Sequence, residues 1–322
     1  MEPKPTRESH AMDQFECLRS FMAPRYFVAD RVELSEQGFT SGRIDNWCRG
    51  GRLVQVAHGV YSLGRDIDTR EAALRVALLL AGPGSALTAR SACEEWRAVE
   101  RSLAIPSRIE VATASGKATT HQGRSPALRN TRIKVVHRSL EPGDFLRLNK
   151  LEVVRPVLAI VDFAVDAGER DVRFAFLEAC RLKLMTRGTV NECYRRIYGR
   201  RGARKLRPLL GLWVPELGRI KSVFEGLVLL DWIELKYSMP LINCKVLGWE
   251  VDLYWPQQRY ILELDGGAFH SDPVQRTIDR QKQMFLESRG LTVNRLTYAA
   301  FDADPVGELR KIAWDLGFLQ GV

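Results

Sequence analysis

Three carboxylates in the last third of the sequence are spaced so that they could share one site. Asp252 lies in one apolar stretch, and Glu263 and Asp265 alternate with apolar residues in the next. Residues two apart on a strand point to the same face, so Glu263 and Asp265 are expected to project together. A turn at 256–258 would join the two stretches into a hairpin and bring Asp252 alongside them. Clustered carboxylates suit a hard cation such as Mg²⁺ or Mn²⁺, and such a site can activate water against a phosphodiester bond.

An alternative interpretation is that these acids are ordinary polar residues at strand ends. A carboxylate inside an apolar strand, however, costs free energy of burial unless it is paired or bound to a metal. We therefore favour a metal site formed by Asp252, Glu263 and Asp265.

The surrounding hydrophobic pattern predicts alternating helices and strands. Apolar residues recur at helical spacing in some segments and form short strand-like runs in others. The expected helices are 220–235, 274–289 and 305–316, and the expected strands are 241–246, 249–255, 260–264 and 291–296. This order predicts an α/β sandwich around a central mixed sheet.

The N-terminal part predicts a small helical unit that ends in a hairpin. Residues 1–10 are expected to form a loose tail. The expected helices are 13–21, 29–37 and 43–49, and the expected strands are 53–56 and 60–63. Gly59 in the intervening turn is free to adopt a positive φ. Helix, turn, helix and hairpin in this order are typical of a winged helix-turn-helix.

The middle of the chain predicts a mixed α/β region. The expected helices are 69–80, 87–96 and 172–185, the expected strands are 108–114 and 131–137, and 153–165 suits either. Residues 115–130 are rich in Gly, Ser and Thr and are expected to form an exposed loop. Residues 195–207 hold seven basic and no acidic residues, which suits a solvated face or a nucleic-acid contact.

We therefore predict a multidomain α/β protein. Its expected domains are a winged helix-turn-helix at 12–64, a mixed α/β region at 65–215 and a nuclease-like domain at 218–318. Pro208 and Pro215 are expected to mark the last boundary.

Composition favours a polyanionic partner. The 322 residues include 48 Lys and Arg against 39 Asp and Glu, a formal net charge of +9. The polar start of the sequence and the absence of a long apolar run predict a cytoplasmic protein with no membrane partner. The six cysteines are scattered without paired spacing, so we expect reduced thiols and no zinc site. The sequence does not distinguish a monomer from a homodimer.

The last domain resembles the Vsr-like (very-short-patch-repair) branch of the PD-(D/E)XK nuclease superfamily over about residues 218–318. The resemblance is carried by several short motifs in a fixed order. They are Ser222-x-x-Glu225, Val251-Asp252, Glu263-Leu264-Asp265-Gly266, His270, Asp279-Arg280 and the segment 290–297. The sequence departs from the family at the lysine of the E-x-K motif, whose position Asp265 occupies. Lys282 could be a relocated site lysine, but a solvated helix charge is the preferred interpretation.

The resemblance implies a restriction-endonuclease-like α/β sandwich and a role for each matching residue. Asp252 would be the central metal ligand, with Glu263 and Asp265 completing the site or orienting water. Glu225 would reach in from its helix as a supporting acid, although helix-surface glutamates are common. His270 would act as general base or acid, since imidazole titrates near neutrality; it could also merely occupy the loop before the next helix. The phosphate contacts implied are Arg280 and Arg295.

The N-terminal half resembles the winged-helix region of AbiEi-type antitoxins over roughly residues 15–140. The matching residues are Gly38-Phe39-Thr40, the segment 50–54, the segment 59–63 and the segment 86–92. The resemblance implies DNA binding, with one helix near the major groove and one arginine on the backbone. The groove residues implied are Ser41, Arg43, Asn46 and Arg49, and the backbone contact implied is Arg52.

Two functions from different classes follow. The first is a Mg²⁺-dependent DNA endonuclease directed by an N-terminal DNA-binding domain, in phage defence or DNA repair; RNA is left open as a substrate. The alternative is a non-catalytic, antitoxin-like DNA-binding transcriptional regulator. The acid set favours the first, and the missing E-x-K lysine favours the second.

Overall fold

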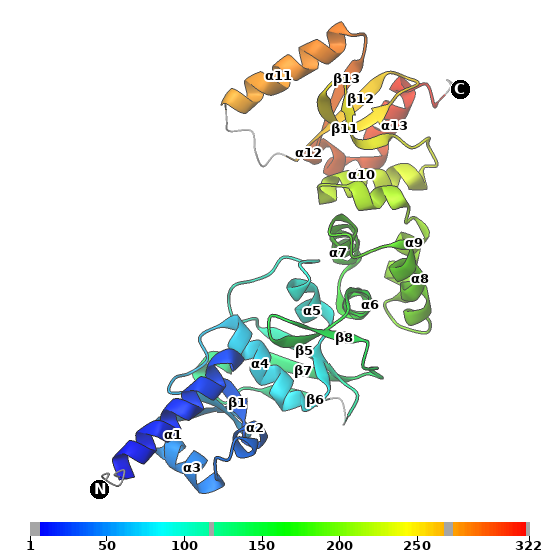
Figure 1. The fold of residues 1–322 in the computed structure, drawn as a ribbon. Coiled ribbons are helices and arrows are strands. Elements are labelled where there is room, and N and C mark those ends of the chain that lie inside the picture. The colour runs from blue at the N-terminus through cyan, green and yellow to red at the C-terminus, as the bar shows by residue number, and fades with distance from the viewer. Residues whose placement is uncertain (1–6, 116–118, 267–272, 320–322) are drawn as a thin grey trace. The chain divides into compact units, whose positions relative to one another are not determined.

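The computed structural model describes residues 7–115, 119–266 and 273–319. The chain divides into two compact units, Met1–Asp166 and Ala167–Val322. Each unit is mixed α/β, which confirms the predicted fold class at that level (Figure 1). The three predicted domain boundaries stay predictions.

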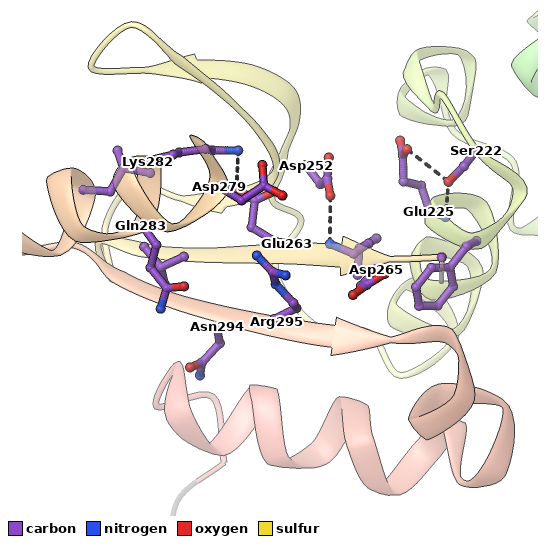
Figure 2. A pocket seen from close by; sticks show the side chains of 15 residues that line it. Ser222, Glu225, Asp252, Glu263, Asp265, Asp279, Lys282, Gln283, Asn294 and Arg295 are labelled. Atoms are coloured by element: carbon purple, nitrogen blue, oxygen red, sulfur yellow. Dashed lines mark hydrogen bonds and ion pairs between the residues drawn. The ribbon is translucent and has the colours of Figure 1, made fainter. Parts of the chain in front are cut away.

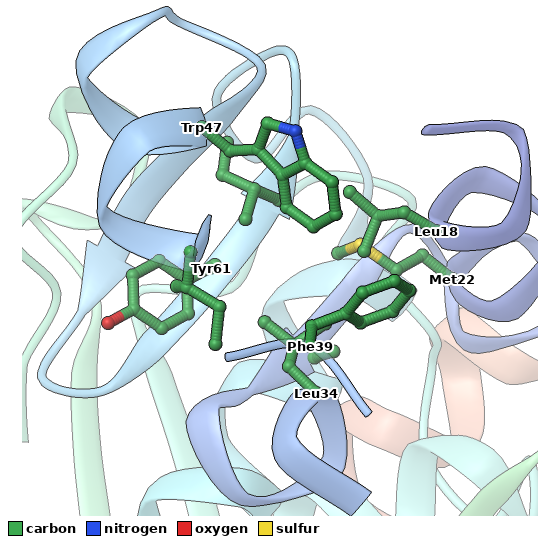
Figure 3. Packing of buried hydrophobic residues seen from close by; sticks show 9 residues of the cluster. Leu18, Met22, Leu34, Phe39, Trp47 and Tyr61 are labelled. Carbon is green, nitrogen blue, oxygen red and sulfur yellow. The ribbon is translucent and has the colours of Figure 1, made fainter. Parts of the chain in front are cut away.

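Unit 1 begins with three helices and a small antiparallel sheet. The helices are α1 (Arg7–Met22), α2 (Arg31–Glu36) and α3 (Ser41–Arg49), and the strands are β1 (Val28–Asp30), β2 (Leu53–Ala57) and β3 (Val60–Leu63). The sheet order is β1-β3-β2. Side chains from all three helices meet in one apolar core that includes Leu18, Leu34 and Trp47 (Figure 3).

The predicted helix 29–37 is wrong at its start. Val28–Asp30 pairs with β3 as a strand instead. The Asp30 carboxylate then accepts the backbone N–H of Glu33 at 2.8 Å, and the Glu33 carboxylate accepts the backbone N–H of Asp30. This capping box satisfies free N–H groups at the helix N-terminus, so the helix begins at Arg31.

The rest of unit 1 is built on a mixed six-stranded sheet of order β6-β7-β5-β4-β9-β8. Its strands are β4 (Ser85–Leu87), β5 (Arg108–Thr113), β6 (Thr119–Gln122), β7 (Arg132–His137), β8 (Phe145–Leu148) and β9 (Leu151–Val154). The helices are α4 (Arg70–Ala81), α5 (Ala89–Glu95) and α6 (Pro156–Asp166). Residues 153–165, which suited strand or helix, supply the end of β9 and most of α6. Pro156 opens α6, where a missing N–H costs nothing.

The predicted exposed loop 115–130 is wrong in part. Within it β6 pairs with β7, and η2 (Pro126–Leu128) buries Leu128 completely. Polar composition favoured a loop, but edge pairing and one buried leucine fix this segment on the sheet.

Unit 2 combines a helical part with a four-stranded sheet of order β10-β11-β12-β13. Its first helices are α7 (Glu169–Arg181), α8 (Arg187–Arg196), α9 (Ala203–Gly211), η3 (Pro215–Arg219) and α10 (Val223–Glu234). The sheet and its helices follow as β10 (Leu241–Val246), β11 (Trp249–Trp255), β12 (Tyr260–Asp265), α11 (Pro273–Ser288), β13 (Thr292–Thr297), α12 (Tyr298–Ala303) and α13 (Pro305–Asp315). The sheet is mixed, because β12 and β13 run parallel and the other pairs antiparallel.

Helix α10 joins the two parts of unit 2. One side contacts α7, where Arg173 and Asp231 form an ion pair, and another contacts α13. Trp232 of α10 lies 5.1 Å from Trp255 of β11, ring centroid to ring centroid. Pro208, expected at a domain boundary, lies inside α9. Because α9 contacts α7, the basic run belongs to the same compact unit as the carboxylates.

Candidate active site

The predicted carboxylates line a pocket of about 670 Å³ in unit 2 (Figure 2). Side chains of α10, β11, β12, α11 and β13 form its walls. Among them are Glu225, Asp252, Glu263, Asp265, Asp279, Lys282, Gln283, Asn294 and Arg295. The pocket lies where β12 ends and the crossover to its parallel neighbour β13 begins, as is usual for sites in α/β sheets.

Asp252 is held by the strand next to its own. The predicted hairpin is confirmed, since β11 pairs antiparallel with β12 and Leu253 lies opposite Leu262. Beyond that pair, Oδ2 of Asp252 accepts the backbone N–H of Leu264 at 2.8 Å. This bond fixes the carboxylate at the pocket and leaves its second oxygen to other groups.

The Glu263 carboxylate has a raised pKa. Burial raises its pKa above the ordinary value, and the charge of Asp252 adds to the effect, while Lys282 and Arg295 oppose it. The net pKa is raised, so a negative charge is costly here. Oε1 of Glu263 is buried, and an ammonium lies close to it.

That ammonium belongs to Lys282, and the preferred interpretation of this residue was wrong. Its Nζ lies 2.7 Å from Oε1 of Glu263, an ion pair, and its side chain is only 19% exposed. Helix α11 faces the pocket through residues spaced i, i+3, i+4 and i+7, namely Asp279, Lys282, Gln283 and Leu286. That spacing is visible in the sequence and places the four side chains on one face of a helix, but it does not show which face the sheet covers.

Glu225 lines the same pocket but is bonded to the start of its own helix. Its carboxylate accepts from the backbone N–H of Lys221 at 2.9 Å, the hydroxyl of Ser222 at 3.1 Å and the Asn243 amide at 2.6 Å. Ser222 caps α10 by accepting the Glu225 N–H. The Ser222-x-x-Glu225 motif therefore fixes the helix terminus and the β10 contact, and a catalytic role for Glu225 stays a prediction.

The remaining predicted residues differ in position. Asp265 lies at the end of β12 and lines the pocket, as does Arg295, the register partner of Glu263 on β13. Arg280 is exposed on α11 and does not line the pocket. His270 lies outside the described residues.

The donors suit a hard cation, although the expected three-carboxylate set stays a prediction. In the ranges that the structure describes, no three His, Cys, Asp or Glu side chains form a group that could hold a metal ion. Asp252 and Glu263 supply oxygen donors, and Glu263 is a buried carboxylate whose charge a cation would neutralise. Mg²⁺ is usually held by one or two carboxylates and keeps several waters, so this pair fits it.

The predicted DNA-binding residues of unit 1 are all exposed. On α3, Ile44 and Trp47 are buried. The residues that face solvent are Ser41, Arg43, Asn46, Arg49 and, just after the helix, Arg52. A polar, basic row on a short helix is what groove contact requires, and binding itself stays a prediction.

Without added cations, Glu263→Gln is expected to make unit 2 more stable than wild type at neutral pH. A raised pKa means that the folded state holds the proton more tightly than the unfolded chain, whose value is near 4.5. The proton on Glu263 therefore contributes its full stability to the folded state below about pH 4.5. This contribution is lost as pH rises through the folded pKa. Thermal unfolding by tryptophan fluorescence in EDTA, from acidic to neutral pH, should show the advantage absent below about 4.5, growing as pH rises and complete above the folded pKa.

The matched control for that measurement is Glu250→Gln, an exposed glutamate on β11 that pairs with Lys221. It should leave the unfolding temperature within experimental scatter at every pH. A Glu263→Gln chain that is less stable at neutral pH would mean that the Lys282 ion pair outweighs the cost of burial.

A comparison of the sequence with protein-family models finds no match, and a comparison with curated proteins finds none either. Within the described residues, no helix has both the length and the apolar character needed to cross a membrane. The likeness to Vsr-like nucleases and AbiEi-type antitoxins therefore stays a prediction.

Proposed function

We propose that unit 2 is a nuclease that hydrolyses phosphodiester bonds in DNA with a bound Mg²⁺ or Mn²⁺. The observation that supports it best is the joining of Asp252, Glu263 and Lys282 in one pocket that Arg295 also lines. Two adjacent carboxylates, a partly buried lysine and an exposed arginine are the group types that phosphodiester hydrolysis needs.

Each side chain has a distinct task in this proposal. Asp252 and Glu263 would hold the cation, which supplies polarisation of the phosphoryl oxygen and a lowered pKa of water. Lys282 offsets the charge of Glu263 and lies where it can donate to the attacking water or the phosphate. Arg295 offers a guanidinium fork to the phosphate oxygens. Lys282 would thus take the part of the lysine missing from the E-x-K position.

The N-terminal residues of unit 1 would direct the nuclease to DNA as a winged helix-turn-helix. Support comes from the order of α2, α3 and the β2–β3 hairpin, and from the exposed row on α3. The same row supports the second candidate, a DNA-binding transcriptional regulator related in function to antitoxins, in which the pocket would not catalyse. A chain of this kind would bind an operator without metal and cut nothing.

The test is cleavage of supercoiled, linear and mismatched DNA and of RNA, in Mg²⁺, in Mn²⁺ and in EDTA. Wild type is expected to cut DNA only with the cation, and Lys282→Met to cut about 100-fold more slowly because the water or phosphate loses its donor. Lys245→Met, an exposed lysine on β10, is the control and should cut normally.

Two outcomes would count against the nuclease. Equal rates for Lys282→Met and wild type would remove the lysine from the mechanism. If the protein binds DNA without metal and cleaves no substrate, the transcriptional regulator is the better assignment.

A further inference from the structure

The helical hairpin formed by α8 and α9 exposes a basic surface that the pocket chemistry does not use. Residues 195–207 hold seven basic and no acidic side chains. The two helices contact each other, and their apolar residues are buried on the inner side. The buried set is Val190, Cys193, Ile197, Leu206, Leu209 and Leu210. The basic residues are therefore left on the outer side by the packing itself.

Three arginines of this surface lack an acidic partner. Arg195, Arg201 and Arg207 are exposed, and no carboxylate in the described part of the chain pairs with them. Other arginines of unit 2 are neutralised, as Arg173 is by Asp231 and Arg181 by Glu178. Unpaired like charges repel one another, so a surface that keeps them together gains from an anionic ligand.

Aromatic and amide groups lie among these charges. Tyr198, directly after α8, is 83% exposed, and Asn191 and Tyr194 are exposed on α8 itself. Positions 187, 191 and 194 are spaced i, i+4 and i+7, so they form one stripe along α8, and Tyr198 lies in the turn that follows the helix. A solvated charge run needs no exposed tyrosine, whereas polynucleotide-binding surfaces combine arginine with aromatic rings.

A hollow of about 310 Å³ lies beside the stripe. It is lined by Arg187 and Tyr194 of α8 and by Trp213, among others. The indole N–H of Trp213 is buried and has no acceptor among the described residues. A donor without an acceptor, in a hollow that Arg187 also lines, fits a ligand rich in acceptor oxygens.

We infer that the α8–α9 hairpin, defined by Arg195, Tyr198, Arg201 and Arg207, binds the phosphodiester backbone of DNA. The inference extends the proposed function, since it gives the nuclease unit its own contact with the substrate outside the pocket. Contacts of arginine with phosphates are sequence-independent, so this surface adds affinity and orientation and no base specificity.

The test is binding of fluorescent duplex DNA, single-stranded DNA and duplex RNA to the full chain, in EDTA and over a range of salt. The variant combines Arg195→Gln, Arg201→Gln and Arg207→Gln. Each phosphate contact contributes about 0.9 to the slope of log affinity against log salt. The variant should lower that slope for duplex DNA by about 3 and weaken binding about tenfold or more near physiological salt.

The control variant loses the same charge from the same unit. Lys236→Gln, Lys245→Gln and Arg310→Gln lie on exposed positions of other elements and should leave the slope within about one. Unchanged thermal unfolding of both variants shows that they fold.

The inference is overturned if the hairpin variant binds DNA as wild type does, if both variants lose affinity equally, or if wild type binds no polynucleotide. Stronger loss for RNA than for DNA would overturn the choice of DNA. Because every measurement is made in EDTA and reads binding, a chain that never cleaves can still pass this test. Failure of the hairpin and failure of the nuclease are thus distinguishable.

Discussion

Asp252→Asn is expected to bind DNA as wild type does and to cleave it about 10³-fold more slowly or worse, a loss of about 4 kcal/mol in transition-state stabilisation. The substitution removes one of the two carboxylates that would hold the cation. Asparagine keeps the shape of the side chain, and its carbonyl oxygen can still accept the Leu264 N–H. The hairpin should therefore stay intact while the charge is lost.

Cleavage of supercoiled plasmid under single-turnover conditions, at saturating Mg²⁺, is the measurement. The matched control is Glu250→Gln, which removes a carboxylate from the same strand two residues away. Because Glu250 is exposed and lines no part of the pocket, that variant should cut at the wild-type rate. Normal cleavage by Asp252→Asn would refute the assignment of Asp252.

Arg70→Ala is expected to destabilise unit 1 by about 3 kcal/mol, because it breaks a buried ion-pair network. The Arg70 side chain is 1% exposed, bonds Glu94 at 2.8 Å and also pairs with Glu95. Burial lowers the pKa of Arg70, but its hydrogen bonds to Glu95 and Glu94 outweigh burial and leave the pKa raised. This expected loss of stability is at the lower end of the range for breaking a buried ion pair, because Arg90 and Arg101 still contact the two glutamates.

Urea unfolding is monitored by hydrogen exchange in peptides that cover residues 70–95. This readout reports the stability of unit 1 within the full chain. The control is Arg90→Ala, which removes an arginine from the same Glu94 at a side chain that is 55% exposed. An exposed pair is worth about 1 kcal/mol or less, so the control should barely shift the midpoint. Equal shifts in the two variants would show that burial does not govern this network.

The sequence alone determined the parts of the candidate site that depend on local structure. Alternation of apolar residues around Asp252 and Glu263, with a short turn between them, predicted the β11–β12 hairpin, and the structure confirms it. On α3 the resemblance implied that Arg43 and Arg49 face outward, and in the structure they are exposed while Ile44 and Trp47 are buried, as the spacing of one helix requires. In both cases residues within one or two elements fix the result through strand and helix geometry.

Tertiary structure alone decided which distant groups meet the carboxylates. The parallel pairing of β12 with β13 sets Arg295 opposite Glu263, and the packing of α11 brings Lys282 to the same carboxylate. Sequence spacing could not distinguish a buried lysine from a solvated one, because that depends on which face of α11 the sheet covers. Packing also joined the basic α8–α9 hairpin to unit 2, although Pro208 in α9 was expected to lie at a boundary. In each of these cases the free energy gained by burying apolar surface between distant elements outweighs the small conformational preferences of single residues.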